Sequence, residues 1–200
     1  MDKTAGPERV GGHVALDFAN TAAGRDTGHP VEHLPDVAAL TGRVEASGLL
    51  DEEAIARVRD ALSVDPELGR RTYDEATRLR EAIHRVGQAL AHGQEPDPRH
   101  VRRIAGWAAE AFAKGTLART EDGVFRLDCA RTPPACALLG PLALAMVELL
   151  SSPDVRRIGQ CEGEGCGWLF IDRSRTGNRR WCDMRTCGNR NKAKRHRARR

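Results

Sequence analysis

The sequence predicts an α+β protein: a mostly helical N-terminal domain with a few short strands, followed by a small cysteine-bearing module. Three observations support this prediction. Apolar residues recur with the helical period through much of residues 35–150. Short segments rich in strand-forming residues lie beside turn sequences. Four of the six cysteines fall within residues 159–200, where they form two evenly spaced pairs.

The N-terminal segment is expected to contain one short strand. Val14, Leu16 and Phe18 alternate with other residues, which is the period of a strand. The strand would end at Asn20. The segment 22–34 is rich in Gly, His and Pro, so it is expected to be a loop.

Five helices and one hairpin follow. Asp51 is a suitable N-cap, Gly48 and Gly93 are stop signals, and Pro96 and Pro98 delay the next helix to about residue 100. The turn sequence Glu121-Asp122-Gly123 lies between strand formers and predicts a hairpin. The expected elements are helices over 35–48, from Asp51 through Leu62, and over 66–92, 100–114 and 134–150, with the hairpin over 117–128.

The chain is expected to be cytoplasmic and to bind no membrane. Its first 30 residues carry several charges and no long apolar run of the kind that a secretory signal needs. The longest apolar stretch, 135–147, is interrupted by Gly140 and Pro141 and is shorter than the roughly 20 residues of a membrane helix. We therefore predict that this stretch forms a buried core helix. In a reducing cytosol, clustered cysteines favour metal binding over disulfides.

The cysteine pattern predicts a structural zinc site. Cys161 and Cys166 are separated by four residues, fifteen more follow, and Cys182 and Cys187 are again separated by four. Two such pairs can complete a tetrahedral site of four thiolates, which leaves no open position for a substrate. An iron–sulfur cluster or a redox dithiol is the alternative. Positive-φ turns are expected at Gly163, Gly165 and Gly167, and the two remaining cysteines, Cys129 and Cys136, are expected to be buried hydrophobic residues.

The segment around these cysteines resembles a treble-clef or zinc-ribbon module, joined to the body near residue 158. Trp168 and Phe170 indicate one strand, and we expect it to pair with a second strand over 179–181. Asp183 can cap a helix that continues through the tail. The aromatic residues are interpreted as a small core, with base stacking as the alternative. Zinc, worth about 10–16 kcal/mol in finger peptides, would supply most of the folding energy.

Charge is distributed unevenly and predicts a polyanionic partner. Residues 159–200 contain twelve Lys and Arg against four Asp and Glu, a net charge of +8, whereas residues 1–158 carry −4. Nucleic acid is the expected partner; a solvated tail or an acidic protein surface is the alternative. Arg190, Lys194 and Arg197 share one helix face. The candidate phosphate contacts are Arg173, Arg175, Arg179, Arg180, Arg190, Lys192, Lys194, Arg195 and Arg197.

Two family resemblances follow from these motifs. The run from Cys161 through Trp181-Cys182-x-Met184 to Cys187-Gly188-Asn189-Arg190 resembles the CGNR zinc finger. The segments 16–21 (Leu-Asp-Phe-Ala-Asn-Thr) and 79–83 (Leu-Arg-Glu-Ala-Ile) resemble the ABATE domain of stress-induced transcription regulators. The resemblance implies a bacterial zinc protein that regulates transcription, and it favours DNA over RNA as the nucleic acid.

Signals for small-molecule binding or catalysis are sparse. His13, Asp17 and Asn20 would gather near the end of the first strand and could line a pocket for an effector; a cap or turn role is the alternative. A nuclease is the main enzymatic alternative, with Asp183 and His196 as its candidates. No nucleophile elbow, P-loop or HExxH pattern occurs in the sequence, so the protein is expected not to be an enzyme.

Overall fold

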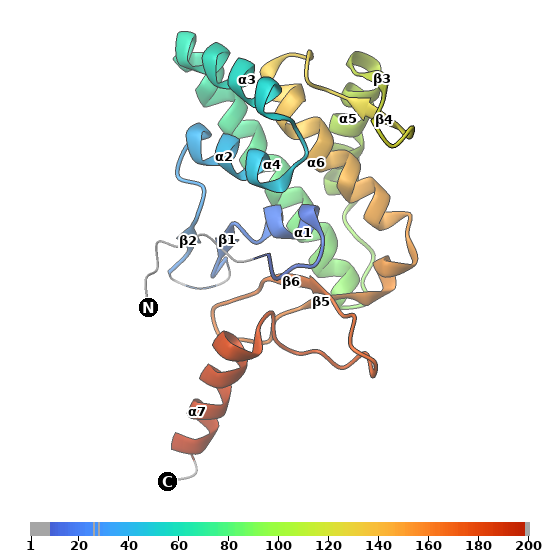
Figure 1. Cartoon of the computed structure of the whole chain (residues 1–200). Coiled ribbons are helices and arrows are strands. Elements are labelled where there is room, and N and C mark those ends of the chain that lie inside the picture. Colours follow the sequence, from blue (N-terminus) through green and yellow to red (C-terminus); the bar gives the residue numbers. More distant parts are fainter. Residues whose placement is uncertain (1–8, 26, 28, 199–200) are drawn as a thin grey trace.

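The protein is described by a computed structural model over residues 9–25, 27 and 29–198. A bundle of helices forms its body, and the C-terminal module lies at one end (Figure 1). The long α4 helix is central, and α1, α5 and α6 pack against it. The helices of the body are α1 (Val14–Ala19), α2 (Val37–Ser47), α3 (Glu52–Val64), α4 (Pro66–Ala91), α5 (Pro98–Lys114) and α6 (Pro134–Leu150).

Local capping signals position the predicted helices. The carboxylates of Asp36, Asp51 and Asp65 accept hydrogen bonds from backbone N–H groups in the first turns of α2, α3 and α4. Gly48 ends α2 with a φ of 72°. The α5 helix begins at Pro98, earlier than expected. Proline is tolerated there because the N–H groups of the first helical turn have no partner within the helix.

The predicted N-terminal strand is wrong, since residues 14–19 form the α1 helix. Ala15, Leu16, Phe18 and Ala19 are all buried, so α1 is covered on most sides by α4, α6 and the C-terminal module. A short helix that is buried on most sides has no wide polar stripe, and its few residues can imitate the period of a strand. The expected loop over 22–34 also contains a small ladder between β1 (Ala22–Ala23) and β2 (Val31–Glu32).

The predicted hairpin and the apolar helix are confirmed. β3 (Thr116–Arg119) pairs with antiparallel β4 (Phe125–Asp128), and Gly123 takes a φ of 82° in the turn. Within the described part of the chain, one helical segment, residues 134–151, is long and apolar enough to cross a membrane by length and composition. Of that segment, 61% is buried inside the protein, which is the packing expected of a core helix.

The C-terminal strands pair differently from the prediction. β6 (Leu169–Ile171) pairs with β5 (Ile158–Gln160), so its partner precedes the first cysteine pair and is not the 179–181 segment. The loop holding Cys161 and Cys166 is therefore the hairpin turn, closed by the Cys161 N–H donating to the Trp168 carbonyl at 2.8 Å. The turn η1 (Pro153–Arg157) precedes β5, and the helical turn η2 (Met184–Gly188) and α7 (Asn189–Arg197) end the described chain.

The β5–β6 hairpin belongs to the core of the body. Ile158, Leu169 and Ile171 are buried in the same hydrophobic cluster as α1, α4 and α6. The side chain of Asn20 binds the backbone of Leu169 twice: its Nδ2 donates to the carbonyl and its Oδ1 accepts from the N–H, both at 2.8 Å. A domain boundary near residue 158 stays a prediction. Residues on both sides of that position belong to one hydrophobic core.

Candidate metal centre and basic surface

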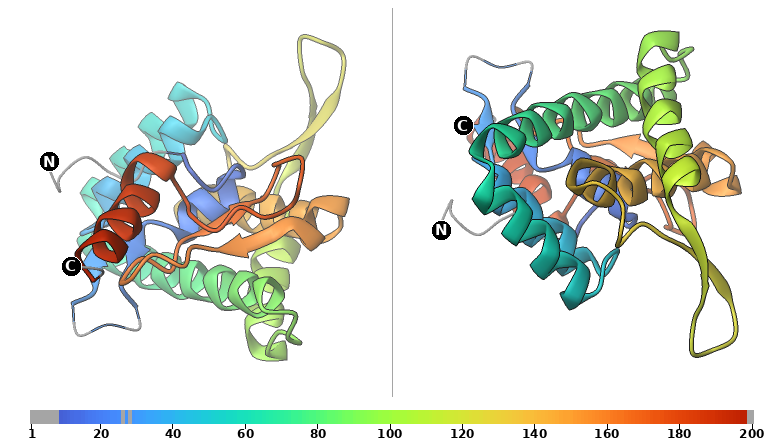
Figure 2. Two further views of the ribbon diagram at one scale, coloured as in Figure 1. Left: turned by 90° about the horizontal axis from the view of Figure 1, so that it is seen from below. Right: turned by 90° about the horizontal axis from the view of Figure 1, so that it is seen from above.

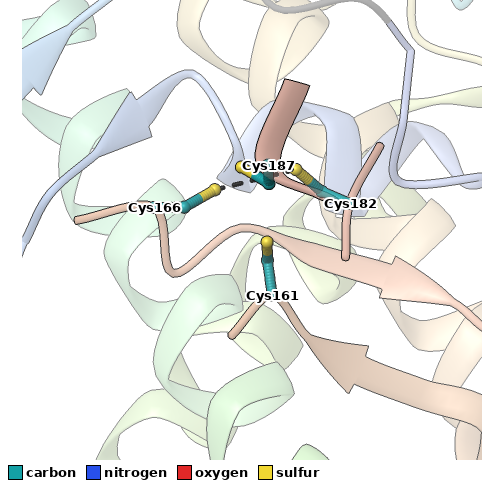
Figure 3. A group of neighbouring side chains, drawn as sticks. All are labelled: Cys161, Cys166, Cys182 and Cys187. Atoms are coloured by element: carbon teal, nitrogen blue, oxygen red, sulfur yellow. Dashed lines mark hydrogen bonds between the residues drawn. The ribbon is translucent and has the colours of Figure 1, made fainter. Parts of the chain in front are cut away.

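The four predicted ligands converge on one point. The sulfurs of Cys161, Cys166, Cys182 and Cys187 lie within 4.8 Å of one another and point toward a common centre (Figure 3). The Sγ atom of Cys182 is 3.7 Å from that of Cys166 and 3.6 Å from that of Cys187. A tetrahedral site with zinc–sulfur bonds of about 2.3 Å needs sulfur separations near 3.8 Å. The thiolate set therefore fits one structural zinc ion.

The first cysteine pair lies on a tight knuckle that needs glycine. The Gly163 N–H donates to the Cys161 sulfur at 3.4 Å. A Cβ atom at Gly163 would lie 2.9 Å from the Cys187 sulfur, so close approach, and not a positive φ, requires glycine there. Gly165 and Gly167 do take the expected positive φ values of 69° and 68°.

The second cysteine pair spans the turn η2, which leads directly into α7. The Asp183 carboxylate accepts from the N–H groups of Arg185 and Thr186 at 2.6 and 2.9 Å, so its predicted role as a cap is confirmed. The backbone hydrogen bond from the Gly188 N–H to the Asp183 carbonyl closes a turn wider than an α-helical one. Zinc bound at Cys182 and Cys187 would therefore fix the start of the basic helix.

The four thiols of the cluster do not titrate alike, because hydrogen bonds among the sulfurs raise the pKa values of Cys166 and Cys182 above their usual range. Hydrogen bonds from Cys166, and from Cys182 and Cys187, hold the pKa of the Cys161 thiol far below its usual range. Bound zinc requires thiolates, so its binding releases the other thiol protons. Cys129 lies outside the cluster; its burial raises its pKa to about 11, and with the buried Cys136 it has the inert environment expected of a small hydrophobic residue.

The aromatic residues of the module form a small core around the metal site. Phe170 is fully buried against Cys161, Cys182 and Cys187, and Trp168 and Trp181 pack at its edge. The strand alternation separates Phe170, on this side of β6, from Leu169 and Ile171, which face the body. This packing supports the core interpretation over base stacking.

Arg179 was predicted to contact phosphate, and the structure corrects this. Its guanidinium donates to four backbone carbonyls, those of Val10, Ile171, Trp181 and Cys182. It also lies 4.3 Å from the centre of the Phe170 ring. The Arg179 side chain therefore connects the N-terminal segment to the second knuckle from inside the module. Its N–H groups supply hydrogen bonds to carbonyls of both segments. The sequence held no signal for this role, because its partners are backbone atoms.

Three of the other candidate cations have acidic partners. Arg180 pairs with Glu162 across the two knuckles and lies over the Trp181 ring. Arg173 is 3.3 Å from Asp154, and Lys194 is 2.6 Å from Glu164. These pairs are exposed and individually weak. The remaining candidates are exposed and have no acidic partner among the residues that the structure describes: Arg175, Arg190, Lys192, Arg195 and Arg197.

The α7 helix carries four of those five cations into solvent. It projects from the end of the molecule, away from the helical body (Figure 1). The view from below shows the same helix beside the segment that links β6 to the second knuckle (Figure 2). No residue of α7 is buried. Its position depends on η2 and the metal site, since its contacts with the rest of the chain are few.

Two family models together match most of the chain. The model described as "ABATE: Putative stress-induced transcription regulator" matches residues 12–153. The chain belongs to the ABATE family. The model of the CGNR zinc finger matches residues 157–200 and contains all four cysteines. No curated protein matches the chain.

The ABATE domain holds two of the three predicted pocket residues at one cavity. His13 and Asp17 line a space of about 300 Å³ with Phe18 and Arg43. Burial raises the pKa of Asp17 and lowers that of His13. Both also have local roles: His13 accepts from the Ala15 N–H as the cap of α1, and Asp17 accepts from the Gly11 N–H.

Asn20 does not belong to that cavity, so its inclusion was wrong. It is fully buried at the C-terminal end of α1, where both of its amide atoms bind Leu169 of the CGNR finger. The two nuclease candidates lie on neighbouring elements of the finger. Asp183 caps η2, and His196 is exposed on α7.

Proposed function

We propose that this ABATE-family protein is a bacterial, cytoplasmic transcription regulator that binds DNA through its CGNR finger. The observation that carries the proposal is α7: an exposed helix whose start is held by two metal ligands and whose Arg190, Lys192, Arg195 and Arg197 have no acidic partner among the described residues. A helix of this width fits the major groove of B-DNA, and its arginines can bind phosphates or base edges.

The metal site supports this role by supplying rigidity. A free basic tail would lose conformational entropy each time it docked, whereas a helix already fixed at Cys187 loses less. Lys194 is paired with Glu164, but both side chains are largely exposed. Such an exposed pair is weak, so a DNA phosphate can replace the carboxylate as the partner of Lys194.

The test is duplex DNA binding by the zinc-loaded protein across a salt series. The α7 variant is Arg190→Ala/Arg195→Ala/Arg197→Ala, and alanine keeps the helix. A matched control, Arg119→Ala/Arg126→Ala/Arg131→Ala, removes three exposed arginines at the β3–β4 end of the body. For each lost phosphate contact, the slope of log K against log salt should fall by about 0.9 in the α7 variant and stay unchanged in the control.

Failure of the parent to bind duplex DNA at low salt, with zinc confirmed by elemental analysis, would overturn the proposal. The same series with duplex and single-stranded RNA identifies an RNA-binding protein. Salt-sensitive binding to an acidic protein, with none to nucleic acid, identifies an interaction adaptor. Cleavage of plasmid DNA with Mg²⁺ or Mn²⁺ that is lost on His196→Ala identifies a nuclease.

We also infer that the cavity beside His13 and Asp17 takes a small-molecule effector. The segment that contributes Gly12 and His13 to its lining is connected to the finger. The Gly11 carbonyl accepts from the Ile171 N–H at 2.9 Å, and the Val10 carbonyl accepts from Arg179 at 3.1 Å. A metabolite panel tests this by thermal shift and DNA affinity, with Ala46→Trp at the cavity rim as the blocked control. A panel with no effect on the parent counts against an effector.

A further inference from the structure

A second basic site lies where the ABATE domain joins the finger. A cavity of about 440 Å³ opens between the η1–β5 segment and the loop over residues 172–179. Four arginines line it. Arg179 is held by backbone carbonyls. The other three are Arg156 and Arg157 from η1, and Arg175 from the loop. Ser174 and Thr176 add two hydroxyl groups to the same lining. The cavity therefore combines positive charge with neutral hydrogen-bonding groups.

The three arginines are available for a ligand. All are exposed, and none has an acidic partner among residues 9–25, 27 and 29–198. The neighbouring Arg173 is different, because it pairs with Asp154 at 3.3 Å. The one carboxylate in the lining, Asp172, already accepts from the N–H groups of Ser174 and Arg179, each at 2.8 Å. The cavity consequently keeps an excess of positive charge.

The loop that carries Arg175 has a defined shape. Gly177 takes a φ of 62°, and its N–H donates to the Ser174 carbonyl at 3.4 Å. The Thr176 hydroxyl lies 2.8 Å from the Asn178 side-chain oxygen, and Arg179 anchors the end of the loop through its backbone contacts. Arg175 on this loop and the two arginines of η1 come from different segments, so they can approach one tetrahedral anion from different directions.

The loop that carries Arg175 lies on the same side of the molecule as α7 (Figure 2). Seen from below, the loop that follows β6 and the α7 helix both lie toward the viewer and extend in different directions from the metal site (Figure 2). A duplex that docked on α7 and also reached this loop would gain a contact in addition to those of the helix. The two sites are linked through the Cys182 knuckle and the β5–β6 hairpin.

We infer that this cavity is a phosphate-binding site for the backbone of the nucleic acid that α7 binds. Arg156, Arg157 and Arg175 neutralise the phosphate. The inference rests on the proposed function and extends it, because Arg156 and Arg157 come from η1, before the first cysteine. Contacts with DNA would then involve the junction of the two domains as well as the finger.

The test compares the variant Arg156→Ala/Arg157→Ala/Arg175→Ala with the parent, the α7 variant and the hairpin control Arg119→Ala/Arg126→Ala/Arg131→Ala. Duplex DNA binding is measured by fluorescence anisotropy from about 50 to 200 mM salt, with zinc content and circular dichroism confirming that each protein is folded. The salt slope of the cavity variant should fall by about 0.9 for each lost contact, and up to about 2.7 for all three. The hairpin control should keep the parent slope.

The possible outcomes separate the two proposals. If the parent binds no duplex, the proposed function fails and takes this inference with it. If the parent binds and the α7 variant loses slope, but the cavity variant keeps it, only the cavity inference is overturned. A pyrophosphate titration identifies the source of the phosphate. Saturable pyrophosphate binding that persists beside excess duplex would assign the cavity to a free phosphoanion and overturn the backbone contact.

Discussion

The body and the finger are held together by different forces. The body buries large apolar side chains of α1, α4 and α6 in one cluster. The finger has a cluster of only four buried residues, three of which are cysteines. Burial of apolar area stabilises the first, and metal–thiolate bonds must stabilise the second.

The two halves of the finger are also stabilised differently. Its β5–β6 half shares the core of the body, through Leu169 and Ile171. Its η2–α7 half depends on Cys182, Cys187 and the brace of Arg179. Metal loss should therefore release one half of the finger and leave the other in place, and the following variants test that difference.

The largest expected effect is that of Cys182→Ser. Loss of one of four thiolates should abolish stoichiometric zinc, remove most of the roughly 10–16 kcal/mol that such a site contributes to a finger, and free η2–α7. The helical body should stay folded. Zinc analysis, limited proteolysis and circular dichroism measure the three consequences. Cys129→Ala, outside the cluster, is the control and should keep its zinc. Global unfolding of Cys182→Ser would show that the body also depends on the metal.

Leu169→Ala should destabilise the body, although Leu169 lies in the finger. The residue is fully buried in the main cluster, and truncation of such a leucine costs about 2–5 kcal/mol. Leu117→Ala is a matched control, because Leu117 is 68% exposed and its truncation should cost under about 0.5 kcal/mol. Denaturant unfolding compares the two. Equal stabilities would mean that the finger does not share the core.

His84 should make this junction sensitive to acid. It is buried with Nε2 3.1 Å from the Gly167 carbonyl, and burial lowers its pKa from 6.5 to about 4. The unfolded chain therefore takes up a proton between about pH 6.5 and 4 that the folded chain excludes, so stability should fall as the pH falls through that window. The loss would reach about 3 kcal/mol.

His84→Gln keeps an N–H donor for Gly167 and removes the titration. Its free energy of unfolding should lose that part of the pH dependence, measured by urea unfolding at pH 7 and pH 4.5. His100→Gln, an exchange of a half-buried histidine on α5, is the comparison and should keep the parent profile. A His84→Gln profile identical to that of the parent would contradict the assignment.

The smallest of these effects is expected for Asn20→Ala. The change leaves the N–H and the carbonyl of buried Leu169 without the partners that Asn20 supplies, at a cost of about 1–3 kcal/mol. Asn178→Ala removes one hydrogen bond of an exposed side chain and should be nearly neutral. If DNA affinity falls in Asn20→Ala while zinc is retained, the pairing also orients the finger on the body.

Much of the fold followed from local signals in the sequence. The caps at Asp36 and Asp51, the stop at Gly48 and the turn at Gly123 act within a few residues of themselves, so their elements could be predicted. The four metal ligands could be predicted for a similar reason: two short knuckles and the chemistry of thiolates limit what the spacing can build.

Tertiary structure decided the remainder. Residues 14–19 form a helix that α4, α6 and the finger cover on most sides, and the partner of β6 depended on where the first knuckle turned. Arg179 and Asn20 bind backbone atoms far away in the sequence, and Arg156 and Arg157 meet Arg175 only across the folded junction. The sequence by itself determined the metal site and the helices α2 to α6 because their causes are local. Only the folded chain determined which cations are free to bind, because an ion pair depends on which distant side chains come together.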